Sequence, residues 1–337
     1  MRSSRLLLAV LLWFATAAAG ATQPRPYHVV MLLFRGCEEA CQGFQDHFRR
    51  QKVPVRFTLR DASQDKRLIP GFVAEAKRMR PDLVVAWGTS VAVATAGQWD
   101  AVDPAVHITD IPVVFMAVTD PVRSRLIPSL AGSGRNLAGT LYLLPVDEQL
   151  RAARTYLDFR TIGFLYNPAE ANSRISLEDL RAAAARVGAT VVAETLALDA
   201  SGRPDPSGIP DHFSALAAAG VDLFYCSPDS FINSQRERIT AEALNNRLPL
   251  FAAAEAPVAQ ADGLFGVVVR YDRVGRFTAR LALRILQDGV RPGDMPVELP
   301  RQFSYLINLH TVKVLERYPP LSLLDVAEFV GDGEGAR

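Results

Sequence analysis

The chain has 337 residues, of which 49% are apolar and 22% are charged, and its formal net charge is +1. This length is sufficient for two domains of ordinary size. The share of apolar residues excludes an intrinsically disordered chain. A charge so close to zero argues against nucleic acid or an anionic membrane as the main partner.

The first 21 residues have the pattern of a secretory signal peptide. Arg2 and Arg5 precede an apolar run from Leu6 to Ala19, and small residues continue to Ala21. A membrane-spanning helix needs about 20 apolar residues, and this run is shorter. We therefore expect cleavage near Ala19 or Ala21 and export of a soluble protein to the periplasm.

Export would place the three cysteines in an oxidising compartment. Cys37 and Cys41 are close enough in sequence to bridge across the first turn of a helix. Free thiols and a metal site are the alternatives, but no His or third Cys lies nearby at zinc spacing. A disulfide is therefore the preferred interpretation, whereas Cys226 ends an apolar run and is expected to be a buried thiol.

Taken in order, the first half alternates between strand-like and helix-like segments. Strands are expected at 29–34, 53–59, 82–87 and 113–118, and helices at 38–52, 68–79, from Ser90 and from Asp120-Pro121. The Gly-rich passage 132–139 lacks the glycine spacing of a dinucleotide loop, and no Lys-Ser or Lys-Thr pair follows as in a Walker loop. It is interpreted as a turn that leads into a crossover.

The second half repeats this alternation. Strands are expected at 162–166, 191–196, 222–226, 248–251, 264–269 and 303–308, and helices at 146–158, 177–187, 211–219 and 272–288. Residues 202–208 are expected to form an exposed loop. Such alternation predicts an α/β fold with doubly wound parallel sheets.

One pattern occurs twice, at 82–90 and again at 222–230. Each copy is a short apolar run that ends in small polar residues. Uninterrupted apolar runs are typical of strands that are covered on both faces, and open α/β sheets bind ligands at the carboxyl ends of such strands. The repetition predicts two lobes with a ligand cleft between them. We place the first lobe at 22–141 plus 271–300, the second at 142–270 plus 301–330, and a flexible tail at 331–337.

The polar residues after these strands are the candidate ligand contacts. Gly88, Thr89 and Ser90 open a helix and offer hydroxyl and N–H groups to an anion, although an ordinary N-cap explains them too. In the second copy of the pattern, Asp229 occupies the place that matches Thr89 in the first, and its carboxylate suits a cationic group. A carboxylate at a helix start can also simply complement the helix dipole.

Other strand ends supply further candidates. Asp120 precedes Pro121 and is either a ligand contact or a cap. Asn167 and Asn172 flank a similar strand end, and we expect one of them to line the cleft. Glu255 follows the strand at 248–251 and carries the same two interpretations as Asp229.

Three aromatic residues are possible apolar walls: Phe34, Trp87 and Tyr271. Core packing is the alternative for each and the preferred interpretation for Trp87. The five histidines are scattered, and the sequence contains neither a His-Glu-x-x-His pair nor a Gly-x-Ser-x-Gly elbow. We therefore expect no enzyme activity, no cofactor and no metal.

Several segments are similar to a known family. They read "IPVVFMAVTDPV", "GSGRNLAGT", "IGFLYNPAEANS", "DLFYCSPDSFINSQRERI", "RLPLF", "FSYLINLHTVKVL" and "PPLSLL". This ordered set resembles the ABC transporter substrate-binding protein family, which has the type I periplasmic binding protein fold and includes tryptophan- and tyrosine-binding members. The likeness runs roughly from Pro81 to Leu324. Residues 27–80 match only in their strand–helix pattern, and "LLFRGCEEACQGF" departs from the family's pattern.

The resemblance implies an extracytoplasmic receptor that closes on a small amino-acid-like solute and delivers it to an ABC permease in the inner membrane. A sensing module that feeds a membrane histidine kinase is the alternative, and an exported enzyme is a third class. We expect a monomer with no nucleic-acid partner.

Overall fold

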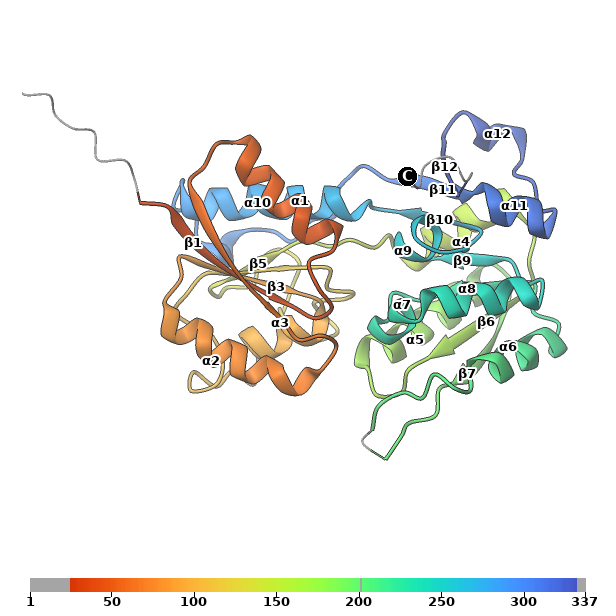
Figure 1. The fold of residues 1–337 in the computed structure, drawn as a ribbon, viewed down its shortest axis with the longest axis horizontal. Coiled ribbons are helices and arrows are strands. Elements are labelled where there is room, and N and C mark those ends of the chain that lie inside the picture. Colours follow the sequence, from red (N-terminus) through yellow and green to blue (C-terminus); the bar gives the residue numbers. More distant parts are fainter. Residues whose placement is uncertain (1–24, 201, 332–337) are drawn as a thin grey trace, which may run out of the picture.

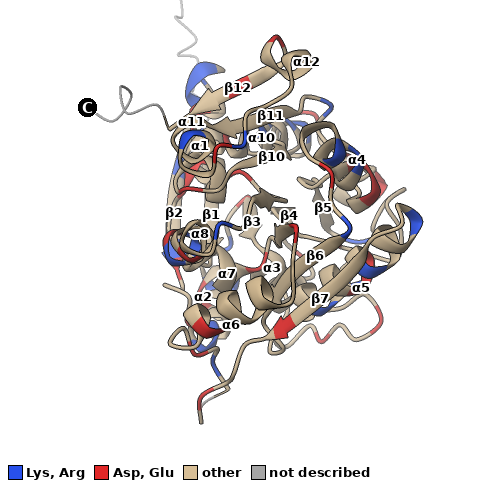
Figure 2. Cartoon of the chain, turned by 90° about the vertical axis from the view of Figure 1, so that its right-hand side faces the viewer, with Lys and Arg blue, Asp and Glu red and all other residues tan. Residues whose placement is uncertain are grey.

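The chain forms two α/β lobes that lie side by side (Figure 1). The computed structural model describes residues 25–331 except residue 201. The predicted signal peptide and residues 332–337 of the predicted tail lie outside the described residues. Basic and acidic residues are interspersed over the elements of both lobes (Figure 2).

Lobe 1 is built on a five-stranded sheet of order β2-β1-β3-β4-β5, in which every pair of neighbours is parallel. Its strands are β1 (Tyr27–Leu33), β2 (Val55–Asp61), β3 (Leu83–Trp87), β4 (Val113–Met116) and β5 (Leu137–Gly139). Its helices are α1 (Glu39–Arg50), the short η1 (Lys66–Leu68), α2 (Ile69–Met79), α3 (Thr89–Ala96) and, from later in the chain, α10 (Tyr271–Leu286).

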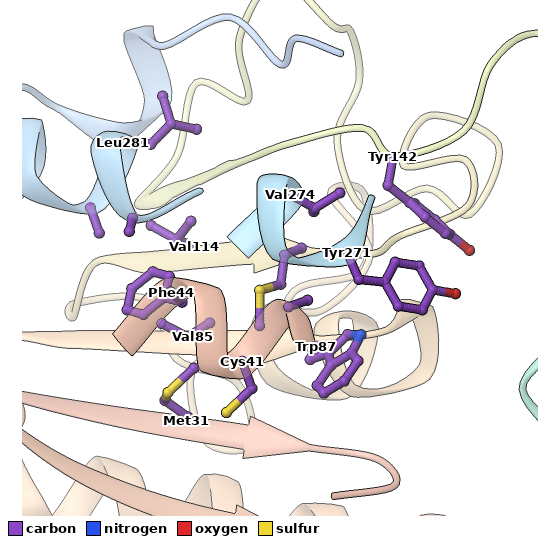
Figure 3. Close-up of a cluster of buried hydrophobic side chains, with 14 of the residues drawn as sticks. Met31, Cys41, Phe44, Val85, Trp87, Val114, Tyr142, Tyr271, Val274 and Leu281 are labelled. Atoms are coloured by element: carbon purple, nitrogen blue, oxygen red, sulfur yellow. The ribbon is translucent and has the colours of Figure 1, made fainter. Parts of the chain in front are cut away.

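Helix α10 packs closely on α1 and covers one face of the first sheet (Figure 3). The close approach depends on two glycines. A Cβ atom on Gly275 would lie 2.0 Å from the backbone oxygen of Ala40, and one on Gly43 would lie 2.4 Å from that of Asp272. Larger residues at these positions would force the two helices apart.

Lobe 2 is built on a seven-stranded sheet of order β12-β11-β10-β9-β8-β6-β7. Its strands are β6 (Thr161–Tyr166), β7 (Thr190–Thr195), β8 (Leu223–Cys226), β9 (Leu250–Ala252), β10 (Phe265–Val268), β11 (Ser304–Asn308) and β12 (Ala327–Val330). Its helices are α4 (Val146–Tyr156), α5 (Ala171–Arg186), α6 (Ile209–Ala218), α7 (Ser230–Ser234), α8 (Arg236–Asn245), α9 (Ala256–Ala259), α11 (Leu309–Leu315) and α12 (Leu321–Leu324). All neighbours pair in parallel except β10 and β11.

The predicted fold class, two doubly wound lobes with mainly parallel sheets, is confirmed. The helix predicted from Asp120-Pro121 is wrong. The chain makes a single turn there because Asp120 caps the amides of Val122 and Arg123, and Arg125 then adopts a left-handed conformation with φ of 61°. Strands β5 and β12 were not predicted.

The chain crosses three times between lobe 1 and lobe 2. It leaves the first sheet after β5 and enters lobe 2 at α4, returns between β10 and α10, and leaves again between the short helix η2 (Pro292–Asp294) and β11. In the part of the chain that the structure describes, no helix combines the length and apolarity needed to cross a membrane.

Candidate ligand-binding site

A central cavity lies between the lobes at the carboxyl ends of the strands. Its free volume is about 30 Å³. Both lobes contribute to its wall, which is lined by Phe34, Arg35, Trp87, Gly88, Thr89, Ala117, Thr119, Tyr142, Asn172, Pro228, Ser230, Asn233 and Tyr271. Its position at the carboxyl ends of the strands is where open α/β sheets bind small molecules.

On the lobe 1 side, helix α3 begins at the cavity. Gly88 precedes it with φ of 92°, a left-handed conformation that glycine adopts without strain, and among the residues that the structure describes no side chain caps the first turn. The Thr89 hydroxyl accepts a hydrogen bond from the Thr119 amide at 3.3 Å. Helix N-termini present unpaired N–H groups and a positive dipole end. This side of the cavity therefore suits an anionic group such as a carboxylate.

On the lobe 2 side, Asp229 lies at the start of α7, the helix that faces lobe 1 (Figure 1). Its side chain is fully buried. Oδ1 accepts the Ile232 amide at 2.8 Å, so the residue does cap the helix. Oδ2 receives no hydrogen bond from the described residues. Asp229 thus combines the cap role with an unpaired carboxylate oxygen, and its neighbours Pro228 and Ser230 line the cavity.

A second buried carboxylate reinforces this negative site. Glu170 is only 4% exposed, and within the described part of the chain its Oε2 receives no hydrogen bond, while Oε1 lies 3.5 Å from the Lys66 ammonium of lobe 1. Burial raises the pKa of Asp229 to about 8, and the charge of Glu170 adds to this. The Ile232 amide and, more weakly, the side chain of Ser173 and the Phe231 amide oppose it. Such a carboxyl is poised to gain from a cationic partner.

Aromatic rings form the remaining walls. Trp87, Tyr142 and Tyr271 lie at the edge of the core cluster between α1 and α10, with the two tyrosine rings 6.3 Å apart (Figure 3). Burial raises the pKa of Tyr142 to about 12, and its hydroxyl lies 3.4 Å from that of Thr119. Trp87 belongs to this core, as expected, and it also lines the cavity.

Arg35, in the turn after β1, completes the wall and contacts both lobes. Its Nε and Nη2 donate to the Glu38 carboxylate at 2.7 and 2.9 Å. With its amide oxygen turned toward the guanidinium, Asn233 of α7 accepts from Nη2 and Nη1 at 2.6 and 3.0 Å. The guanidinium also lies 5.8 Å from the centre of the Trp87 ring. Burial opposes the charge, but the Glu38 hydrogen bond raises the pKa of Arg35 above its ordinary value.

The rim of the cleft carries further contacts between the lobes. Arg123, in the turn of lobe 1, bonds to Glu178 and Asp179 of α5 in lobe 2. These side chains are partly exposed, so each pair contributes at most about 1 kcal/mol. The rim pairs and the Arg35–Asn233 contact connect the two lobes across the cleft.

A wider outer chamber, with a free volume of about 670 Å³, opens next to the central cavity and shares Phe34 with it. Asn167 and Glu170 line the outer chamber. Of the two asparagines predicted near this strand end, Asn172 therefore lines the central cavity and Asn167 the outer chamber.

The structure brings Phe34, Gly88, Thr89 and Asn172 together in the cavity wall, along with the predicted aromatic residues Trp87 and Tyr271. Asp229 is fully buried and does not line the wall itself, but its chain neighbours Pro228 and Ser230 do. Three other predicted residues do not line this wall. Ser90 is the second residue of α3 and lies outside the wall. The Asp120 carboxylate caps the turn that follows it by accepting the Val122 amide. Glu255 binds Arg270 at 2.7 Å and accepts the Tyr271 amide where the chain returns to lobe 1; burial raises its pKa.

Seven lining residues were not predicted: Arg35, Ala117, Thr119, Tyr142, Pro228, Ser230 and Asn233. Three of them had a signal in the sequence, since Pro228 and Ser230 belong to the second copy of the repeated pattern and Thr119 directly follows the strand expected at 113–118. Ala117 reaches a left-handed conformation with φ of 54°, which turns the chain after β4 so that Thr119 reaches the cavity.

Cys37 and Cys41 form a disulfide at the start of α1, and Cys226 is a free, buried thiol. The bridge lies next to the turn that carries Arg35. Within residues 25–331, apart from residue 201, no group of three or more His, Cys, Asp or Glu side chains could hold a metal ion.

Two α/β lobes with a polar and aromatic cavity between them have the two-lobed fold of periplasmic binding proteins. The family model described as "ABC transporter substrate binding protein" matches residues 30–328. The chain therefore belongs to the ABC transporter substrate binding protein family.

Individual relatives agree with this assignment. A tyrosine-binding protein of Clostridioides difficile (strain R20291) is 30% identical over 208 residues, which span 61% of this chain and 57% of that protein. A conserved domain protein from Vibrio cholerae has a similar structure, with a TM-score of 0.78, 24% identity and coverage of 91% and 100% of the two chains. An ABC domain from Streptococcus pneumonia, in complex with L-Trp, has a TM-score of 0.76 and 24% identity, with coverage of 90% and 99%.

Proposed function

We propose that the protein binds a small amino-acid-like zwitterion between its lobes. The observation that carries this proposal is the presence of two unlike groups at the cavity: the start of α3 in its wall, and the buried Asp229 between the lining residues Pro228 and Ser230. The uncapped N-terminus of α3 suits a carboxylate, and the buried, unpaired Oδ2 of Asp229 suits an ammonium group. A ligand with both groups satisfies each side, and a ligand with only one leaves the other unpaired.

The walls indicate the character of the rest of the ligand. Three aromatic rings, Trp87, Tyr142 and Tyr271, offer stacking surfaces. The names of two relatives support the same class, since one is a tyrosine-binding protein and another was solved with L-Trp. We propose no catalytic role, because the cavity offers charge complementarity and apolar walls without a nucleophile and base in contact.

In this proposal the protein is a monomeric periplasmic receptor, exported by its signal peptide, that passes the solute to an ABC permease. Closure of the two lobes on the ligand is the signal that the permease reads. The lobes correspond to residues 22–141 with 271–300 and 142–270 with 301–330. The rim contacts of Arg123 support closure of the lobes, because they join a residue of lobe 1 to residues of lobe 2.

Calorimetric titration of the mature protein with each of the common amino acids tests the proposal. The protein is first unfolded, dialysed and refolded so that no ligand remains from the host. At least one amino acid should bind with a 1:1 stoichiometry, and its decarboxylated and deaminated analogues should bind far more weakly. Tighter binding of sugars or nucleosides, used as controls, would contradict it.

A further inference from the structure

Arg35 has an unusual position for a residue in a ligand cavity. Its charge is already matched, because Glu38 binds it through two hydrogen bonds at 2.7 and 2.9 Å. Only 14% of its side chain is exposed, and the Glu38 carboxylate holds it in one orientation. The guanidinium is therefore a fixed part of the wall rather than a mobile surface cation.

The guanidinium of Arg35 has one N–H group without a partner among the described residues. An arginine side chain carries five N–H groups, one on Nε and two on each terminal nitrogen. Two go to Glu38, and Asn233 Oδ1 accepts one from each terminal nitrogen. Among the contacts of the described residues, one N–H of Nη1 remains uncommitted, and Arg35 lines the cavity.

The other polar groups of the cavity already have partners in the proposed zwitterion. The N-terminus of α3 takes the carboxylate and Asp229 takes the ammonium group. The uncommitted donor of Arg35 is then left for the side chain of the ligand. Since the aromatic rings of Trp87, Tyr142 and Tyr271 share this wall, the side chain should be a ring that carries an acceptor.

We propose that Arg35 is the specificity-determining residue that selects an aromatic amino acid with a neutral oxygen acceptor on its ring. The acceptor is neutral because Glu38 balances the guanidinium charge and would repel a second carboxylate. A ring without an acceptor leaves the remaining N–H unpaired in a closed cavity, and sites built to bond a hydroxyl reject analogues that lack it. This inference rests on the proposed function, since it assigns the side-chain end of the same ligand.

L-Tyrosine and L-phenylalanine are the probes that test it, because they differ by one ring hydroxyl. Calorimetric titration of the wild-type mature protein should give an affinity for tyrosine at least about ten-fold higher, which corresponds to 1.4 kcal/mol. Equal affinities, or a preference for phenylalanine, would overturn the inference while leaving the proposed function intact. Failure of every amino acid to bind would overturn both.

A double variant assigns the preference to Arg35. Arg35→Met with Glu38→Gln removes both charges of the pair, so that no carboxylate is left unpaired. The tyrosine and phenylalanine affinities should then agree within about three-fold. A ratio that stays at its wild-type value would overturn the inference, because another residue would then read the hydroxyl.

The matched control is Arg49→Met with Asp46→Asn, which removes a similar ion pair from the exposed side of α1. This control should keep the wild-type ratio of tyrosine to phenylalanine affinity. If the control also lost the preference for tyrosine, the assignment to Arg35 would be contradicted. If the Arg35 double variant does not fold, as judged by a thermal melt, Arg35→Lys replaces it. Lysine keeps the charge and loses the planar fork, so the ratio should also fall, and an unchanged ratio would overturn the inference.

Discussion

Replacing Asp229 by asparagine should change ligand binding and stability in opposite directions. Asparagine keeps the size of the side chain, and its Oδ1 can still accept the Ile232 amide that Asp229 accepts at 2.8 Å. What is lost is the ability of Asp229 to release its proton and pair as a carboxylate with the ammonium group of the ligand. A hydrogen bond to a charged group contributes roughly 1.5–3 kcal/mol, so the affinity for an amino acid should fall by ten-fold or more.

The stability effect follows from the raised pKa of Asp229, about 8 in the folded protein against 3.8 for an ordinary aspartate. Between these two values the unfolded chain has lost the proton and the folded chain retains it. The free energy of unfolding of the wild type therefore falls as the pH rises, by at most about 1.4 kcal/mol per pH unit. The asparagine variant lacks this loss, so from pH 5 to pH 7 it should gain at most ~3 kcal/mol in free energy of unfolding relative to the wild type.

Urea unfolding of the ligand-free proteins at pH 5, 6 and 7 measures this difference, and calorimetry with the identified amino acid measures the affinity. Asp120→Asn is the matched control, because Asp120 caps a turn in the same way without full burial. A stability difference that does not change with pH would refute the burial argument. Unchanged affinity would remove Asp229 from the site and leave it as a helix cap.

Four other predictions use different properties of the chain. Because ammonium binding should displace the proton of Asp229, the apparent binding enthalpy at pH 7 should depend on the ionisation enthalpy of the buffer; identical enthalpies in two buffers would contradict this. Thiol counting under denaturing, non-reducing conditions should find one free thiol, since Cys37 and Cys41 are bridged, whereas three would contradict the disulfide. Gly275→Ala should lower the free energy of unfolding by about 1–3 kcal/mol, while Gly71→Ala, in open space on α2, should raise it by about 0.5–1 kcal/mol; equal effects in urea unfolding would contradict the α1–α10 packing. N-terminal sequencing of periplasmic protein should begin near residue 20 or 22, and an intact first residue would contradict export.

The parts of the fold that sequence could predict are those set by local pattern. The apolar runs at 82–87 and 222–226 predicted β3 and β8, because strands covered on both faces need no alternation. The polar residues after them, including Gly88 and Thr89, were predicted as site candidates because the carboxyl ends of parallel strands share one edge.

The parts that escaped prediction depend on contacts between distant segments. Arg35 and Asn233 are almost 200 residues apart in the chain and meet only when the lobes close, so no local pattern shows their pairing. Strand β12 was missed because it is a partly exposed edge strand that carries the charged Glu328 and lacks a buried apolar run. Asp120 was expected to start a helix, but its capping bonds serve a single turn equally well.

Native mass spectrometry of the protein purified without refolding tests the central claim most directly, because a closed receptor should retain its solute. The spectrum should show a 1:1 complex with a small molecule. After denaturation this molecule should be identified as an amino acid with a free amine and a free carboxylate. A retained sugar, nucleoside or metal ion, or refolded protein that binds no amino acid, would contradict the account.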